Sequence, residues 1–155
     1  MSNGAHFVDE GCGGVYIANA ITQIVDPSSA FIVFDHAIWE GLGRQGLIPP
    51  NPHVPNEGGT LFKAESIAAL AQAIGAPAAA LTQTAQAYNA AHAGSALQTL
   101  APPHRTTGKY QLMPITQGPF YAAPICAGIT HTMTTKGMAL QGFHRESPYV
   151  HCSNL

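Results

Sequence analysis

The chain has 155 residues, of which 46% are hydrophobic and only 9% are charged. This length suits one core of ordinary size, and the charged share lies far below the roughly 25% of an average soluble domain. The net charge of −2 and the scattered basic residues exclude a nucleic-acid-binding stripe. No apolar stretch approaches the about 20 residues of a membrane span. With so few charges, we expect part of the surface to face another protein surface.

The N-terminus and the cysteines bear on the cellular compartment. The start, "MSNGAHFVDEG", lacks the charged first region and the apolar stretch of a signal peptide. The three cysteines (Cys12, Cys126 and Cys152) are an odd number without close spacing, so we expect no disulfide framework. These features favour a cytoplasmic chain with reduced thiols.

The first predicted elements follow a short extended piece at 5–10. An amphipathic helix is predicted over 15–25, where the apolar face comprises Val15, Ala18, Ile21, Thr22 and Val25. The continuous β-rich run "AFIVF" at 30–34 predicts a central strand. Asp35 can cap a helix that begins after it and ends at Gly41 or Gly43.

A proline-rich segment interrupts the regular elements. Residues 46–59 contain four prolines and predict a loop or lid without regular structure. A short strand is predicted over 60–64, directly after this loop.

A helix pair is the clearest local signal in the chain. Ser66 can cap a first helix whose apolar face comprises Ile67, Leu70, Ala71 and Ile74, and Gly75 ends it. Pro77 suits the first turn of a second helix, which ends at Gly94, and whose face comprises Leu81, Ala85 and Tyr88.

The last predicted element is a strand in "PFYAAPICAGITHTM". Residues 95–117 before it are irregular. Pro124 argues for an edge strand, or for a break between two short strands. Strands and helices alternate without a repeated βαβ period, so the predicted fold class is α+β, a small sheet packed with a few helices.

Most candidate chemistry has a simpler explanation. The eight histidines form no closely spaced ligand pair besides the adjacent His151 and Cys152, so no metal site is predicted. Cys126 is expected to be a small buried side chain, and Asp9 and Glu10 to be solvated acids at a turn. The glycine-rich "GCGG" at 11–14 matches neither a dinucleotide-binding nor a triphosphate-binding loop.

His131 is the strongest candidate site residue. Its neighbours Thr130 and Thr132 and the backbone donors around Gly128 can join it in binding an anionic carboxylate. Histidine also titrates near neutrality and can adapt to a substrate that gains charge. An ordinary histidine at a strand end explains the same residues, and the spacing alone leaves both explanations open.

Four segments, in consistent order, resemble the FAD-binding fumarate reductase/succinate dehydrogenase flavoprotein family. "HFVDEG" is similar to its "RFVNE" segment, and "SAFIVFDHAIWE" to its apolar strand ending in Phe-Asp. "GGTLFKAESIAALAQAIGAPAAALTQTAQAYNAA" is similar to its helix pair, and "PFYAAPICAGITHTM" to its "FYA…TMGG" segment. The resemblance covers about residues 5–133 and implies the substrate-side, or capping, domain of these oxidoreductases.

The resemblance also implies a mechanism and its site residues. In that family hydride passes between flavin N5 and a substrate carbon, an arginine transfers the proton, and a histidine binds a substrate carboxylate. His131 falls on the histidine position. The arginine position falls near Gly14 or Val15, where this chain has no arginine, so no catalytic residue is predicted.

The end of the chain departs from the family. After Met133 the family's glycine pair and the segment that returns to FAD are replaced by unrelated sequence. We therefore expect a cap-like domain at 1–133 and a divergent tail at 134–155. No cofactor is expected in the isolated chain, and FAD is expected only if a separate flavin domain is supplied.

Three functions follow from these expectations. The first is a stand-alone, catalytically incomplete cap-like domain that binds small carboxylates and self-associates through the surface that would face a flavin domain. The second is a subunit of a split FAD-dependent oxidoreductase that acts with a separate flavin domain. The third is a structural or interaction module. No activity is expected from the chain alone, and neither nucleic acid nor membrane is an expected partner.

Overall fold

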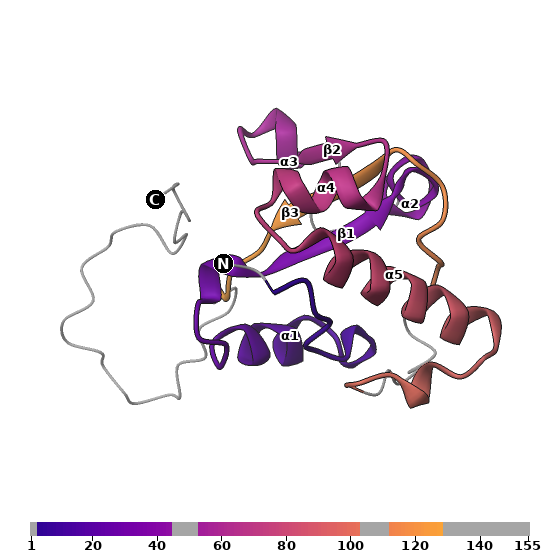
Figure 1. The fold of residues 1–155 in the computed structure, drawn as a ribbon. Coiled ribbons are helices and arrows are strands. Elements are labelled where there is room, and N and C mark those ends of the chain that lie inside the picture. Colours follow the sequence, from indigo (N-terminus) through magenta and orange to yellow (C-terminus); the bar gives the residue numbers. More distant parts are fainter. Residues whose placement is uncertain (1–2, 45–52, 103–111, 129–155) are drawn as a thin grey trace, which may run out of the picture.

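A computed structural model describes residues 3–44, 53–102 and 112–128 of the chain (Figure 1). The described residues form an α+β fold in which a three-stranded antiparallel sheet packs against helices, as predicted. The strands are β1 (Phe31–Asp35), β2 (Phe62–Ala64) and β3 (Phe120–Pro124). The helices are α1 (Gly14–Ile21), α2 (His36–Glu40), α3 (His53–Asn56), α4 (Ile67–Ala73) and α5 (Ala78–Ala93). Short 3₁₀ helices are η1 (Glu10–Cys12), η2 (Pro27–Ser29), η3 (Leu42–Arg44) and η4 (Leu97–Thr99).

The sheet has the order β1-β3-β2, so β3 is its central strand. The sequence prediction was therefore wrong in placing the strand at 30–34 in the centre. Of the two alternatives at Pro124, the edge strand is wrong as well. Pro124 fits a central strand because β2 pairs with β3 only as far as Ala122, so no bond to β2 is lost. On the other side the ladder continues past the proline, where the Ile125 N–H donates to the Ala30 carbonyl at 3.0 Å.

Helices α4 and α5 form the predicted hairpin, and they pack against each other. The Ser66 hydroxyl accepts from the Ala69 N–H at 3.2 Å at the start of α4. Gly75 adopts a φ of +68°, a backbone conformation that favours glycine, in the turn before α5. Three buried side chains form a hydrophobic cluster at this hairpin: Ala71, Ala76 and Leu81. Val33 of β1 packs against this cluster. One face of the sheet is thus covered by this helix pair.

The helix cap at Ser66 gives a direct stability prediction. We expect Ser66→Ala to lower the free energy of unfolding by about 1 kcal/mol, because the Ala69 N–H loses its acceptor. Urea denaturation followed by circular dichroism measures the change. Ser66→Thr keeps the hydroxyl and should retain most of the stability, and equal losses in both variants would contradict the capping role.

Two buried or half-buried polar side chains attach the segment before β3 to the rest of the fold. The fully buried Asp35 accepts from the Ile38 N–H through Oδ1 at 3.0 Å, and from the Thr116 and Gln117 N–H groups through Oδ2 at 2.9 Å each. Asn89 of α5 exchanges two hydrogen bonds with the backbone of Ile115, at 2.7 and 2.8 Å. These contacts set the position from which β3 enters the sheet.

The N-terminal segment lies along α5. The Thr84 hydroxyl donates to the Gly4 carbonyl at 2.7 Å. Gly4 has a φ of +72°, and a Cβ there would lie 2.9 Å from the backbone nitrogen of Leu81, so only glycine allows this approach. The first residues are therefore held against the helix pair before the chain reaches η1 and α1.

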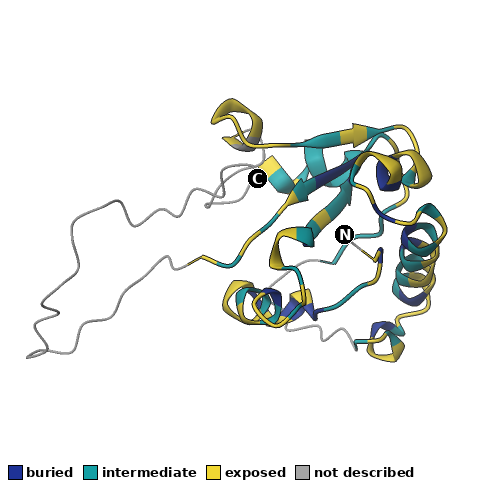
Figure 2. Cartoon of the chain, turned by 60° about the vertical axis from the view of Figure 1, so that its left-hand side comes forward, coloured by how far each residue is buried: buried dark blue, intermediate teal, exposed yellow. Residues whose placement is uncertain are grey.

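Helix α1 is shorter than predicted, and only part of its predicted apolar face is covered. It ends at Ile21, the only residue of the helix that is buried, and Figure 2 shows most of α1 as exposed or intermediate. Val15 and Val25 of the predicted apolar face are exposed, because Val25 lies beyond the helix and Val15 points away from the fold. The prolines at 46–59 were also misread in part, since His53–Asn56 form the short helix α3. Residues 45–52 lie outside the described part.

No helix in the described part of the chain is both long and apolar enough to cross a membrane.

Candidate functional site

The predicted carboxylate-binding residues, His131, Thr130 and Thr132, lie outside the described residues. The described chain reaches Gly128 after leaving β3, and its last ladder bond joins Ile125 to Ala30 next to the start of β1. The boundary between the predicted units 1–133 and 134–155 also falls outside the described part, as does the expected tail.

The position at which the resemblance places an arginine is the start of α1. Gly14 is the first residue of this helix and is exposed, and a Cβ built on it would meet no atom within 4 Å. The position is therefore open to solvent. Arg44 is the only arginine among the described residues. Its guanidinium contacts the Glu40 carboxylate at 2.9 Å, and both side chains are exposed.

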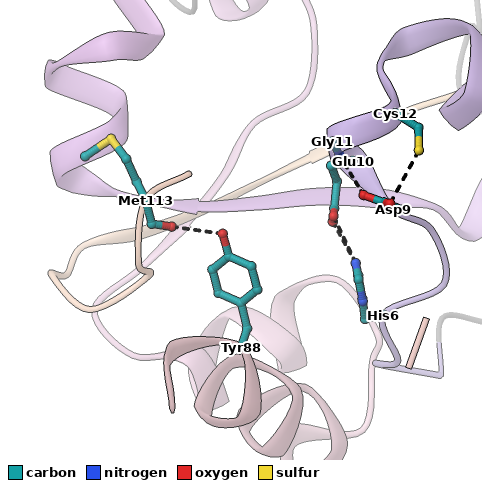
Figure 3. A network of polar contacts seen from close by, with 7 residues as sticks. All are labelled: His6, Asp9, Glu10, Gly11, Cys12, Tyr88 and Met113. Atoms are coloured by element: carbon teal, nitrogen blue, oxygen red, sulfur yellow. Dashed lines mark hydrogen bonds and ion pairs between the residues drawn. The ribbon is translucent and has the colours of Figure 1, made fainter. Parts of the chain in front are cut away.

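A polar network lies where the N-terminal segment turns into η1 (Figure 3). The His6 Nε2 lies 3.0 Å from each carboxylate oxygen of Glu10. The hydrogen bond to Glu10 raises the pKa of His6 above its usual value, against the opposing effect of burial, and the charge of Asp9 adds to the rise. His6 thus carries its charge more readily than an exposed histidine does.

Asp9 is the buried member of this network. Its Oδ1 accepts from the Gly11 N–H at 3.0 Å, which caps η1, and its Oδ2 accepts from the Cys12 thiol at 3.3 Å. Asp9 is only 4% exposed, so the prediction of two solvated acids was wrong for Asp9 and correct for the exposed Glu10. The sequence "DEGC" carried a signal for this role, because aspartate two residues before glycine is typical of a side-chain cap on a turn.

Tyr88 brings α5 to the same network. Its hydroxyl donates to the Met113 carbonyl at 3.2 Å. The pKa of Tyr88 is raised above its usual value, mainly by burial and to a smaller extent by the negative charge of Glu10. The network therefore joins a histidine, two acids, a thiol and a phenol from three parts of the chain, and sequence reasoning found none of these roles.

A second cluster, which is aromatic, lies on the sheet face opposite Val33. Phe34, Trp39 and Tyr121 stack with ring centroids 5.2 to 5.8 Å apart. The Lys63 ammonium lies 5.9 Å from the Tyr121 ring centroid, and the Tyr121 hydroxyl lies 3.4 Å from the His36 Nδ1. These cation–π and stacking contacts pack α2 onto the sheet, and this packing explains why the side chains lie together.

Metal-ligating residues do not gather in the described ranges. No group of three histidine, cysteine, aspartate or glutamate side chains there could hold a metal ion. His151 and Cys152, the adjacent pair in the sequence, lie outside these ranges.

Cys126 differs from its sequence-based expectation. It follows β3 and is exposed, not buried, because the strand ends two residues earlier at Pro124. It is also disulfide-bonded, so the expectation of reduced thiols is wrong at this position.

Comparison with known proteins places the fold. No family model matches the chain, and no curated protein does. Among solved structures, the chain matches the open conformation of a flavocytochrome c3 fumarate reductase with a TM-score of 0.61 and 22% sequence identity. The match covers 81% of this chain and 20% of the flavocytochrome, so the chain spans about one fifth of that protein. The chain therefore shares its fold with a part of a fumarate reductase.

Proposed function

We propose that the chain is a substrate-side domain of the fumarate reductase type that binds small carboxylates and, by itself, does not reduce them. The observation that carries the proposal is the structural likeness to a flavocytochrome c3 fumarate reductase over 81% of this chain. The four sequence segments that resemble the flavoprotein family also support the proposal. In the described fold they contribute to η1, to β1 with α2, to β2 with the α4–α5 hairpin, and to β3.

The lack of turnover follows from the position of Gly14. On the sequence resemblance, this region is where an arginine would transfer the proton to or from the substrate carbon. Neither Gly14 nor Val15, the two residues on which the position can fall, has a side chain that transfers a proton, and a general acid is typically worth about 10²–10⁴-fold in rate. The hydride would also need a flavin, whose chemistry a protein positions but does not replace.

Carboxylate binding is assigned to His131, supported by Thr130 and Thr132. A protonated imidazole donates a charge-assisted hydrogen bond to a carboxylate, and the two threonine hydroxyls are further donors. This combination favours small di- and tricarboxylates over neutral ligands.

The histidine gives the decisive prediction. We expect His131→Ala to weaken fumarate or succinate binding by about tenfold or more, because one charge-assisted hydrogen bond is lost. Isothermal titration calorimetry on the intact chain measures the affinity. His53→Ala is the matched control, since His53 is an exposed histidine on α3, and it should leave the affinity unchanged.

Two outcomes would contradict the proposal. If no di- or tricarboxylate binds the chain, an interaction module becomes the better explanation. If fumarate reduction appears when a separate FAD-binding protein is added, the chain is instead a subunit of a split oxidoreductase. A colourless mixture without reductase activity excludes that second outcome.

A further inference from the structure

Two contacts connect η1 to α5 through the N-terminal segment. Gly4 is fixed to Thr84 of α5 by a 2.7 Å hydrogen bond. His6 follows two residues later and contacts both oxygens of Glu10. Glu10 is the first residue of η1, which leads through Gly13 into α1. The contact between His6 and Glu10 therefore joins η1 to a segment that is itself held on α5.

We propose that the His6–Glu10 ion pair is a pH-operated latch that holds η1, and with it the start of α1, in place. When His6 is protonated, the contact is a charge-assisted hydrogen bond to a carboxylate. When His6 is neutral, the same geometry gives only an ordinary hydrogen bond, which is about half as strong. The proposal concerns how the start of α1 is held and does not depend on carboxylate binding.

The surrounding charges favour the protonated form. Asp9 and Glu10 are the acids that act on His6 from its own segment, and the Cys12 thiol is turned toward Asp9. From α5, Tyr88 faces Glu10, and His92 lies beyond it with its ring 6.4 Å from that of Tyr88. Figure 3 shows His6 in contact with Glu10, while the Tyr88 hydroxyl points toward the Met113 carbonyl.

The direction of the pH dependence follows from the raised pKa of His6. A group whose folded-state pKa lies above its unfolded value stabilises the folded form fully below the unfolded pKa of about 6.5. That contribution is lost as the pH rises through the folded pKa. The latch is thus closed in mildly acidic solution and weakened in alkaline solution.

Hydrogen exchange of the intact chain tests the latch. The reporter amides are Cys12 and Gly13, which close η1, and Ile17, which donates to the Gly13 carbonyl in the first turn of α1. After correction for the intrinsic exchange rate, we expect their protection to fall about fivefold between about pH 5.5 and 8.5, because a charge-assisted hydrogen bond stabilises by about 1 kcal/mol more than a neutral one. The midpoint should follow the His6 ring titration, recorded by NMR in the same sample.

Matched variants separate the latch from general effects. His6→Gln and Glu10→Gln should both give low protection without this pH dependence, and His53→Gln, on the exposed α3, should behave as the wild type. The Leu70 amide, which donates to Ser66 at the start of α4, reports on the rest of the fold and should not change. If either N-terminal variant fails to fold, the other carries the same test.

The proposal is overturned if protection stays constant while His6 titrates, or if His6→Gln keeps the full pH dependence. It is also overturned if Leu70 loses protection in parallel with Gly13, because the pH effect would then be global.

Discussion

Replacement of Asp35 by alanine is expected to lower the free energy of unfolding by about 3–5 kcal/mol. Asp35 is 1% exposed, and its carboxylate accepts three backbone N–H groups, one from α2 and two from the segment before β3. Each hydrogen bond to a charged group contributes about 1.5–3 kcal/mol, and the loss stays below the sum of three because water can reach the exposed Thr116 and Gln117. The loss should be large because one side chain holds two neighbouring strand ends, the exit from β1 and the entry to β3, which lie side by side in the antiparallel sheet. Urea denaturation followed by circular dichroism measures it.

Two further variants test whether the geometry of the carboxylate causes the loss. Asp35→Asn keeps the volume but offers one oxygen, so it should satisfy either Ile38 or the Thr116–Gln117 pair and lose about half as much. Asp26→Ala is the matched control, because Asp26 also caps a short helix, η2, but at an exposed position. It should cost far less than Asp35→Ala. Similar losses at the two aspartates would show that Asp35 acts only as a helix cap.

The elements that could be predicted from the sequence are those fixed by local contacts. The α4–α5 hairpin was predicted with its cap at Ser66, its turn at Gly75 and its end at Gly94, and each of these acts within a few residues of chain. The capping role of Asp35 was likewise predicted and is confirmed by its bond to Ile38. Its bonds to Thr116 and Gln117 span more than 80 residues, and no local pattern announces them.

The order of the strands could not be predicted, because strand pairing is non-local. The run at 30–34 is apolar throughout, and such runs are typical of strands with neighbours on both sides. In β1 the apolar character has another cause. Val33 packs on the helix pair, while Phe34 stacks on Trp39 and Tyr121 on the opposite face, so both faces carry packed side chains although the strand lies at an edge. Ile32 of the same strand is half exposed.

The candidate sites show the same difference between local signals and contacts that form only in the fold. His131 was selected by its neighbours and by a family resemblance, and it lies outside the described residues. The network of His6, Asp9 and Glu10 depends on the chain folding back on itself, and adjacent acids in a sequence more often lie at a solvated turn. Asp9 is buried, and its carboxylate caps η1, which is followed by Gly13 with a φ of +85°.

Replacement of Leu70 by alanine is the second large expected effect, a loss of about 2–5 kcal/mol. Leu70 is fully buried on α4, the helix that packs against α5 and against β2 and β3. Truncation of a fully buried leucine leaves a cavity, because a closely packed surrounding structure relaxes into it only in part. A domain of this size has only about 5–15 kcal/mol of stability, so the variant should melt at a clearly lower temperature or unfold.

Leu42→Ala is the matched control for this prediction, because the same side chain at η3 is 37% exposed. A surface change of this kind usually alters stability by less than about 0.5 kcal/mol. Urea denaturation of the two variants in parallel gives the comparison, with tryptophan fluorescence of Trp39 as a probe of the sheet. Equal losses at Leu42 and Leu70 would contradict a core centred on the helix pair. A large loss at Leu70 alone, with the α4 amides losing exchange protection together with those of β3, would show that the hairpin and the sheet unfold as one unit.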